Sequence, residues 1–317
     1  MRSISALYIR LPNWVGDVCM SLPALELAIN TGKPVVVCAR PWARNLLRSY
    51  QIDDFISIDS KLYSSAKLVK QHKVANYKHG AFGLLLPDSL SSALIFKYAG
   101  IKSSGYRDDG RTLFLNTPIN KPTIHMHAVE AWHNLVYTSL LRWGLQPSSN
   151  KPGSELNLKL DDQHHEAALN ALNKAGIKPG EFVLIAPTAV GTHKGRNKVW
   201  PHFNNLTSSL IAQGIKVAMC PPPSETEQAI SNAPDATIIP SIGVGEFAAL
   251  TLQSKLVVCN DSGVSHLAAA AGAQQITLFG VTDSDRTGPW SKKAIYMGSN
   301  NHWPDPNSVI EQVQGLI

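Results

Sequence analysis

Polar residues follow an apolar, strand-like run in the stretch KLVVCNDSGVSHLAAAAGAQQITLFG, residues 255–280. The pattern predicts a strand, a tight turn, a helix and a second strand, which is half of a doubly wound α/β unit. Such folds bind ligands at this kind of turn. Ser262 and Gly263 let a ligand approach the backbone, and the start of the helix favours phosphate. The plain alternative is an ordinary turn in which Asp261 serves only as the helix N-cap.

The segment Asn13-Trp14-Val15-Gly16-Asp17 follows a second strand-like run, residues 4–10. Gly16 allows a tight backbone turn, and Asp17 is the lone acid in a stretch that is poor in charge. A carboxylate in this position could accept a proton from a substrate hydroxyl as a general base. A helix-cap or turn role for Asp17 is the alternative, and the local sequence favours neither.

A third turn follows the apolar run 182–186 and carries Thr188 together with three cations, Lys194, Arg196 and Lys198. Lys198 precedes Trp200-Pro201, where a helix is expected to begin. A lysine there could neutralise a diphosphate leaving group. For Lys194 and Arg196 a solvated basic loop is the preferred interpretation.

A fourth turn, Pro-Pro-Pro-Ser-Glu-Thr-Glu at 221–227, follows the run 216–220. Acids after strands of Rossmann-type folds often accept hydrogen bonds from ribose hydroxyls. Ser224 and Glu227 have the spacing of a capping box. We therefore expect Glu225, rather than Glu227, to be the ribose ligand.

Alternating strands and helices must position these turns, and they indicate parallel sheets covered by helices on both faces. The polar connector QPSSNKPGSE at 146–155 divides the alternation. We expect two Rossmann-like domains, 1–155 and 156–317, facing a central cleft. The expected strands are 4–10, 35–39, 55–58, 83–86, 103–106, 182–186, 216–220, 237–239, 256–259 and 275–279. Helices are expected near 23–29, 42–49, 91–99, 127–143, 162–175, 203–213, 224–231, 244–252 and 266–271, and a loop at 11–18.

The composition is that of a folded globular protein, with 44% hydrophobic and 16% charged residues. A net charge of +6 and a pI near 9.1 suggest an anionic partner, such as a nucleotide sugar, an acidic glycan or an anionic membrane surface. Nucleic acid is not expected, because the sequence has no aromatic-basic repeat and no dense Lys/Arg run.

Four widely spaced cysteines indicate buried thiols in a reducing compartment, and no Cys/His cluster has the spacing of a metal site. The amino-terminal sequence has no long apolar segment, so we expect a cytoplasmic protein with neither signal peptide nor membrane span. The dinucleotide fingerprint GxGxxG, the Walker A motif and the hydrolase elbow GxSxG are absent.

Taken together, four motifs resemble the ADP-heptose–lipopolysaccharide heptosyltransferases, glycosyltransferase family 9. They are NWVGDVCMSLPAL, LLLPDSLSSALIFKYAGIKSSGY, APT…KVWPHF and NDSGVSHLAAAAG…ITLFGVTDSDRTGPW. The resemblance covers nearly the whole chain. Its WVGD loop is most similar to the branch that adds the second inner-core heptose.

The resemblance implies a glycosyltransferase B fold that binds the acceptor in the first domain and the nucleotide sugar in the second. It also implies inverting transfer without metal or cofactor, from ADP-L-glycero-D-manno-heptose to the Kdo/heptose lipid A inner core. Under this scheme Asp17 is the general base, and Thr188 and Lys198 contact the donor diphosphate. The remaining donor ligands are Glu225, at the ribose, and Asp261, Ser262, Gly263 and His266.

Acceptor contacts are expected from Asn13, Gly16, Arg10, Arg107 and Arg111. These arginines, with Arg40, His125 and His127, would also suit docking on the anionic inner leaflet of the inner membrane without insertion. The chain departs from the family pattern where Cys220 and three prolines replace a Gly-rich turn. A nucleotide-sugar 2-epimerase on the same fold and a catalytically inactive relative stay open as alternatives.

Overall fold

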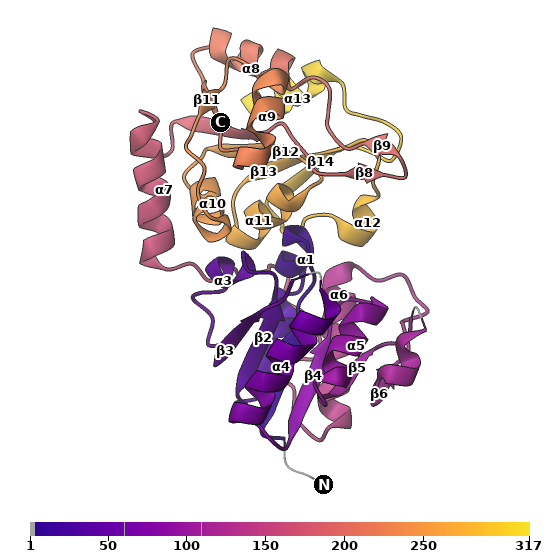
Figure 1. Cartoon of the computed structure of the whole chain (residues 1–317). Coiled ribbons are helices and arrows are strands. Elements are labelled where there is room, and N and C mark those ends of the chain that lie inside the picture. Colours follow the sequence, from indigo (N-terminus) through magenta and orange to yellow (C-terminus); the bar gives the residue numbers. More distant parts are fainter. Residues whose placement is uncertain (1–3, 60, 109) are drawn as a thin grey trace. The chain divides into compact units, whose positions relative to one another are not determined.

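The computed structural model describes residues 4–59, 61–108 and 110–317 (Figure 1). Contacts divide the chain into two compact units. The first comprises the residues up to Arg44 together with Tyr50–Gly153, and the second comprises Asn45–Ser49 and Ser154–Ile317. The division after Gly153 falls inside the polar connector. Assignment of the short segment Asn45–Ser49 to the second unit was not predicted from the sequence.

The first unit is built on a six-stranded parallel sheet in the order β3-β2-β1-β4-β5-β6. The strands are β1 (Ala6–Arg10), β2 (Val35–Ala39), β3 (Asp54–Ser57), β4 (Ala81–Leu85), β5 (Lys102–Tyr106) and β6 (Thr117–Ile119). Helices α1 (Val15–Met20), α2 (Leu22–Ile29), α4 (Leu62–Asn76), α5 (Leu90–Tyr98) and α6 (Ala128–Arg142) connect or follow them. Helix α3 (Ala43–Leu46) also follows β2, and its last two residues belong to the second unit. A 3-10 helix, η1, spans Arg111–Phe114.

Strand β1 pairs with β2 on one side and with β4 on the other, so the strand order reverses at β1. In doubly wound sheets, ligands bind outside the carboxyl ends of the strands at such a switch point. The segment that leads into α1 and carries Asp17 leaves the sheet there.

The second unit has its own six-stranded parallel sheet, in the order β11-β10-β7-β12-β13-β14. Its strands are β7 (Phe182–Ala186), β10 (Lys216–Met219), β11 (Thr237–Ile238), β12 (Leu256–Asn260), β13 (Gln275–Phe279) and β14 (Ala294–Gly298), and β8 (Thr192–His193) and β9 (Arg196–Asn197) form a separate hairpin. The helices are α7 (Asp162–Lys174), α8 (Phe203–Ala212), α9 (Thr226–Asn232), α10 (Val244–Thr251), α11 (Gly263–Ala271), α12 (Ser284–Thr287) and α13 (Pro306–Gln314), with a 3-10 turn, η2 (Pro223–Glu225).

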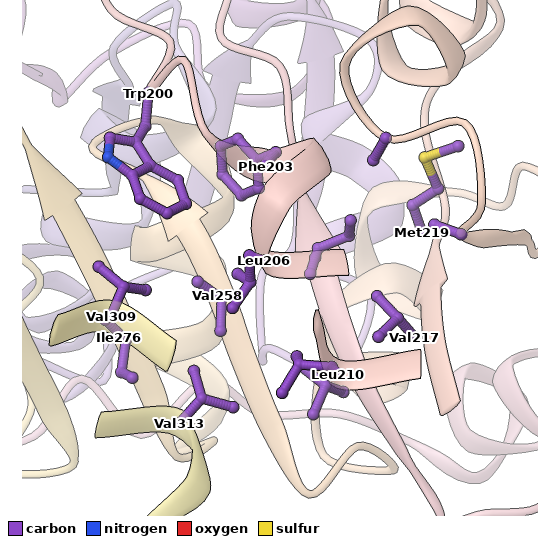
Figure 2. Packing of buried hydrophobic residues seen from close by; sticks show 14 of the residues in the cluster. Trp200, Phe203, Leu206, Leu210, Val217, Met219, Val258, Ile276, Val309 and Val313 are labelled. Carbon is purple, nitrogen blue, oxygen red and sulfur yellow. The ribbon is translucent and has the colours of Figure 1, made fainter. Parts of the chain in front are cut away.

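One face of this second sheet packs against α8 and α13 (Figure 2). Trp200 and Phe203 lie over the apolar side chains of the central strands, and Val309 of α13 closes the same cluster. The opposite face is covered by small residues of α10 and α11 and by Leu172 of α7. Because both faces are covered by helices, the central strands β7 and β12 are buried at every residue, as expected for a buried parallel sheet. The predicted α/β class with two parallel sheets is confirmed.

Two local predictions are wrong. The loop expected at 11–18 gives way to helix at Val15, which places Gly16 and Asp17 on α1. Helix α9 begins at Thr226 after a 3-10 turn, and its N-cap, Glu225, makes no side-chain cap bond. The predicted capping box between Ser224 and Glu227 is therefore not formed.

Among the residues that the structure describes, no helix combines the length and the apolar character needed to cross a bilayer.

Candidate functional site

The second unit brings Thr188 and Glu225 together. Thr188 follows β7 and Glu225 follows β10, and these strands are neighbours with their carboxyl ends at one edge. The Thr188 hydroxyl Oγ1 donates a 2.5 Å hydrogen bond to Glu225 Oε2. Glu227, by contrast, is exposed. Of the two acids that the sequence offered for this edge, Glu225 is the one held beside Thr188.

Asn260, which was not predicted as a site residue, fixes the loops around this pair. Its side chain is 0% exposed. Nδ2 donates to the carbonyls of Ala186 and Thr188, both at 3.2 Å, while Oδ1 accepts from the Trp200 N–H at 2.8 Å. The amide thereby ties the ends of β7 and β12 to the start of the α8 region. The predicted strand ends at residue 259 and leaves Asn260 to the turn, whereas β12 includes it. A polar residue directly after the apolar run LVVC is the sequence signal for this buried amide.

Ser262, rather than Asp261, is the N-cap of α11. Its hydroxyl accepts from Val264 N and Ser265 Oγ approaches Ser262 N, which forms a capping box. The alternative in which Asp261 serves only as the N-cap is therefore wrong. Asp261 is buried, and its Oδ1 lies 4.0 Å from Nε2 of His266, one turn into the helix. Helix α11 ends at Gly272 in the left-handed conformation, φ +83°, which favours glycine.

Tyr296 of β14 extends the site beyond Asp261. Burial, together with the nearby Asp261 carboxylate, raises the pKa of the Tyr296 phenol to about 12. The phenol donates a 2.6 Å hydrogen bond to the carbonyl of Pro289, in the TGP segment 287–289. A side chain on Gly288 would meet the carbonyl of Ser284 at 2.6 Å. The TGP turn is thus tightly packed against Tyr296.

The basic loop after Thr188 folds into the β8–β9 hairpin. Arg196 Nη2 donates to the carbonyl of Val281 and to Asn300 Oδ1, both at 3.1 Å, and Nη1 contacts Asn301. The expectation of a freely solvated Arg196 is therefore wrong, whereas Lys194 is exposed. Lys198 is half-buried and lies two residues before the anchored Trp200.

In the first unit, Asp17 lies in the first turn of α1, beyond the carboxyl end of β1. It is half-buried, and its backbone carbonyl accepts from Ser21 N. Gly16 is buried beside it, while Asn13 and Trp14 are exposed. The segment therefore presents a carboxylate, an amide and an indole at the switch point of the first sheet.

Arg10 is buried rather than presented to a ligand. Its guanidinium donates to the carbonyls of Leu11 and Cys38 and, at 2.5 Å, to Asn13 Oδ1. Burial lowers the pKa of Arg10 to about 10, with Arg40 contributing. Direct contact with an acceptor, as the sequence predicted, would require Arg10 to leave these partners. Its role in this structure is to hold Asn13.

Arg111 is fully buried as well, on η1. Nε donates to the Tyr106 carbonyl at 2.7 Å, and the terminal nitrogens contact the carbonyl of Pro87 and the carboxylate of Asp88. The predicted acceptor contact of Arg111 is thus opposed by its burial, whereas Arg107 is exposed. Charge in the sequence did not reveal which arginines are internal.

No three His, Cys, Asp or Glu side chains group into a metal site within residues 4–59, 61–108 and 110–317. All four cysteines are buried free thiols, as predicted. Burial raises their pKa values, to about 11 for Cys220 and about 12 for Cys38.

Comparison with known proteins places this chain in a family. Lipooligosaccharide heptosyltransferase 2 of Haemophilus influenzae is 26% identical over 301 residues, covering 89% of this chain and 85% of the relative. Lipopolysaccharide heptosyltransferase 2 of Escherichia coli K12 is 25% identical over 308 residues, with the same coverage. The solved structure of E. coli ADP-heptose lipopolysaccharide heptosyltransferase II superposes with a TM-score of 0.78 at 22% identity and covers 98% of both chains.

A putative UDP-N-acetylglucosamine 2-epimerase from Listeria monocytogenes shares only the fold, with a TM-score of 0.52 and 15% identity over 100% of this chain and 88% of its own. The sequence model of glycosyltransferase family 9 (heptosyltransferase) matches residues 66–317, most of the chain. This protein belongs to glycosyltransferase family 9, the heptosyltransferases.

Proposed function

We propose that the protein transfers a heptose from ADP-L-glycero-D-manno-heptose to the inner core of lipopolysaccharide, with inversion and without a metal ion. Family membership supports the transferase class, and two relatives named heptosyltransferase 2 support the acceptor. The observation that carries the proposal is the Thr188–Glu225 pair beside the start of α11, at the switch point of the second sheet.

For the donor, we assign the ribose to Glu225 and the diphosphate to Thr188, Lys198 and the α11 N-terminus at Gly263. Backbone N–H groups at a helix start and a lysine ammonium both favour phosphate oxygens. Asp261 would repel a diphosphate, so its carboxylate suits His266 or a sugar hydroxyl. Ser262 contributes a cap that fixes the helix start.

For the reaction, we assign Asp17 as the general base. The acceptor hydroxyl oxygen bonds to the anomeric carbon of heptose while the bond from that carbon to the diphosphate oxygen breaks. The hydroxyl proton passes to the Asp17 carboxylate, and ADP leaves with the electron pair. A single displacement inverts the anomeric configuration. Positioning and neutralisation of the departing charge supply the remaining catalysis.

We further propose that the acceptor binds near Asn13, Gly16 and Arg107 of the first unit, and that the protein acts in contact with the cytoplasmic face of the inner membrane. The acceptor is a lipid-anchored saccharide bearing carboxylates and phosphates, so its enzyme has to work at a lipid surface. The similarity to heptosyltransferase 2 favours the second heptose as the one transferred.

ADP release from ADP-heptose tests the proposal, with Kdo–lipid A and heptosyl-Kdo–lipid A compared as acceptors. We expect release that depends on the heptosylated acceptor, persists in excess EDTA and gives a product with the opposite anomeric configuration by NMR. Release with neither acceptor, despite ADP binding, would indicate an inactive relative. Interconversion of a nucleotide sugar at C2 without any acceptor would indicate an epimerase.

A further inference from the structure

The net positive charge of this protein is concentrated in one stretch. Residues 61–107 carry eight Lys or Arg and a single acid, Asp88. The chain as a whole carries 29 Lys or Arg and 23 Asp or Glu, so the remainder has 21 and 22. The anionic partner that the composition suggests should therefore meet this stretch of the first unit, which contains α4 and α5.

Helix α4 separates a buried face from a basic exposed face. Ser65, Ala66 and Val69 face the core of the first unit. On the solvent side, residues 63, 67, 70 and 74 follow the four- and three-residue spacing of one helical stripe. These are Tyr63, Lys67, Lys70 and Val74, and all four are exposed. The helix contains no acid.

The end of α5 extends this stripe, because the two helices pack against each other (Figure 1). The ammonium group of Lys73, on α4, lies close to Gly100, just after α5. A methyl side chain at Gly100 would be 3.4 Å from the Lys73 Nζ atom. Lys97 and Tyr98, the last two residues of α5, are exposed there. We call Tyr63, Lys67, Lys70, Lys73, Val74, Lys97 and Tyr98 the α4–α5 patch.

The composition of the α4–α5 patch differs from that of an ordinary solvated helix surface. Such a surface commonly pairs Lys with Glu three or four residues away, whereas Lys67, Lys70 and Lys73 repel one another at these spacings. The patch also exposes two tyrosines, 80% for Tyr63 and 61% for Tyr98. Lysines interleaved with exposed tyrosines suit the boundary between anionic headgroups and acyl chains.

The topology connects this patch to the catalytic edge of the first unit. Helix α4 follows β3, so its amino-terminal end, with Tyr63, lies at the carboxyl edge of the sheet. The Asp17 segment leaves β1 at that same edge. One end of the patch thus lies at the same edge of the first sheet as the proposed general base, and its other end, at Lys97 and Tyr98, lies toward the opposite edge.

We propose that the α4–α5 patch docks the protein on an anionic phospholipid bilayer. Arg10 and Arg111, which the sequence suggested for membrane docking, are buried, so we assign the membrane-binding charge to the lysines of the patch. The choice of a lipid surface rests in part on the proposed function, whose acceptor is anchored in a membrane. The charge and the exposed tyrosines of the patch are independent of that function.

Vesicle flotation tests the proposal with the full-length chain, using phosphatidylcholine vesicles with and without phosphatidylglycerol and without acceptor. We expect binding only to the anionic vesicles, weakening as salt rises. The triple variant Lys67→Gln, Lys70→Gln, Lys97→Gln should lose roughly 100-fold in apparent affinity, about fivefold for each lysine. Tyr63→Ser with Tyr98→Ser should weaken binding several-fold.

The matched control is Lys174→Gln, Lys178→Gln, Lys255→Gln, which removes three exposed lysines of the second unit. It should bind vesicles as the wild type does. Equal losses in both triple variants would overturn the proposal, as would binding only to vesicles that contain the acceptor, or patch-dependent binding to nucleic acid but not to vesicles.

A turnover assay separates this inference from the proposed function. With acceptor dispersed in detergent, the patch variant should release ADP at the wild-type rate, whereas with acceptor in anionic vesicles its rate should fall with its binding. If wild-type protein floats with anionic vesicles but never releases ADP, the proposed function fails and the docking surface stands. Loss of detergent-phase turnover in the patch variant alone would contradict a docking role.

Discussion

At the scale of single residues, the buried amide of Asn260 sets the geometry of the proposed donor site. It bonds the carbonyls of Ala186 and Thr188 and the Trp200 N–H, so three segments depend on one side chain. Thr188, which donates a hydrogen bond to Glu225, lies on one of these segments. Substitution of Asn260 should therefore weaken ligand binding and also lower the stability of the second unit.

Asn260→Leu should lower the free energy of unfolding by about 2–4 kcal/mol, because it leaves an N–H and two carbonyls unpaired in the interior. It should also weaken ADP binding. Asn232→Ala is a matched control, since that amide donates to Pro187 on the same loop from a partly exposed position. Urea unfolding and titration calorimetry provide the measurements. If Asn260→Leu matched the control in both, Asn260 would not organise the site.

Glu225→Gln should raise the Kd for ADP by roughly tenfold, because a hydrogen bond to a charged group contributes about 1.5–3 kcal/mol. Glu227→Gln, two residues away and exposed, should leave the Kd unchanged. If ribose is the partner, the penalty should shrink when a deoxyribose form of ADP is titrated. A larger effect at Glu227 than at Glu225 would reverse the assignment.

Residue types predicted the site residues of the second unit better than those of the first. Thr188 and Glu225 could be inferred because each follows an apolar strand, and parallel strands end at one edge. Arg10 and Arg111 were predicted as ligand contacts from their charge alone, yet both are buried. Their backbone-carbonyl partners become available only after the sheet has folded, and nothing in the local sequence signals them.

At the scale of elements, the segment Asn45–Ser49 joins α7 and α10 within the second unit. Asn45 Oδ1 accepts from Gly245 N at 2.7 Å, and its Nδ2 donates to Glu246. Arg48 makes a two-point contact with Asp161, the N-cap of α7, through bonds of 2.6 and 2.8 Å. Two helix starts therefore depend on a segment distant in sequence.

Asp161→Asn should destabilise the protein at neutral pH but hardly at about pH 2. The bond to Arg48 holds the pKa of Asp161 well below its usual range, as do the bonds to His164. A lowered pKa contributes stability above about pH 4, and this contribution is lost as pH falls toward the folded-state pKa. Because the pair is one-third exposed, we expect about 1 kcal/mol or less.

Unfolding by urea across this pH range is the measurement for Asp161→Asn. The wild-type and variant free energies should converge as the solution is acidified. A difference of constant size from neutral pH to about pH 2 would show that the loss comes from packing or capping rather than from the ionised pair.

Buried strands were the elements that the sequence defined best, since β2, β7 and β13 have the predicted bounds. Each of these strands is a largely apolar run, and the ends of the run define the ends of the strand. Helix α4 was not predicted, because Ser65, Ala66 and Val69 are its few buried residues and they produce a weak apolar period. Helix α1 is only six residues long, and its glycine, together with the preceding Pro12 and Asn13, is typical of a turn.

At the scale of the whole molecule, the proposed base and the proposed donor ligands belong to different units. Asp17 is in the first unit, whereas Thr188, Glu225 and Asp261 are in the second. ADP binding should therefore depend on the second unit, and transfer should depend on both. A substitution at the proposed base should therefore reduce turnover without changing the affinity for ADP.

The measurement that tests the proposed mechanism most directly is acceptor-dependent ADP release by Asp17→Asn, with ADP affinity measured on the same preparation. Turnover should fall by about 10²–10⁴-fold while the Kd for ADP stays at the wild-type value. Glu26→Gln, which alters the next acid along the chain, should leave both unchanged. Full turnover in Asp17→Asn, or an equal loss of ADP affinity, would contradict the assignment of Asp17 as the general base.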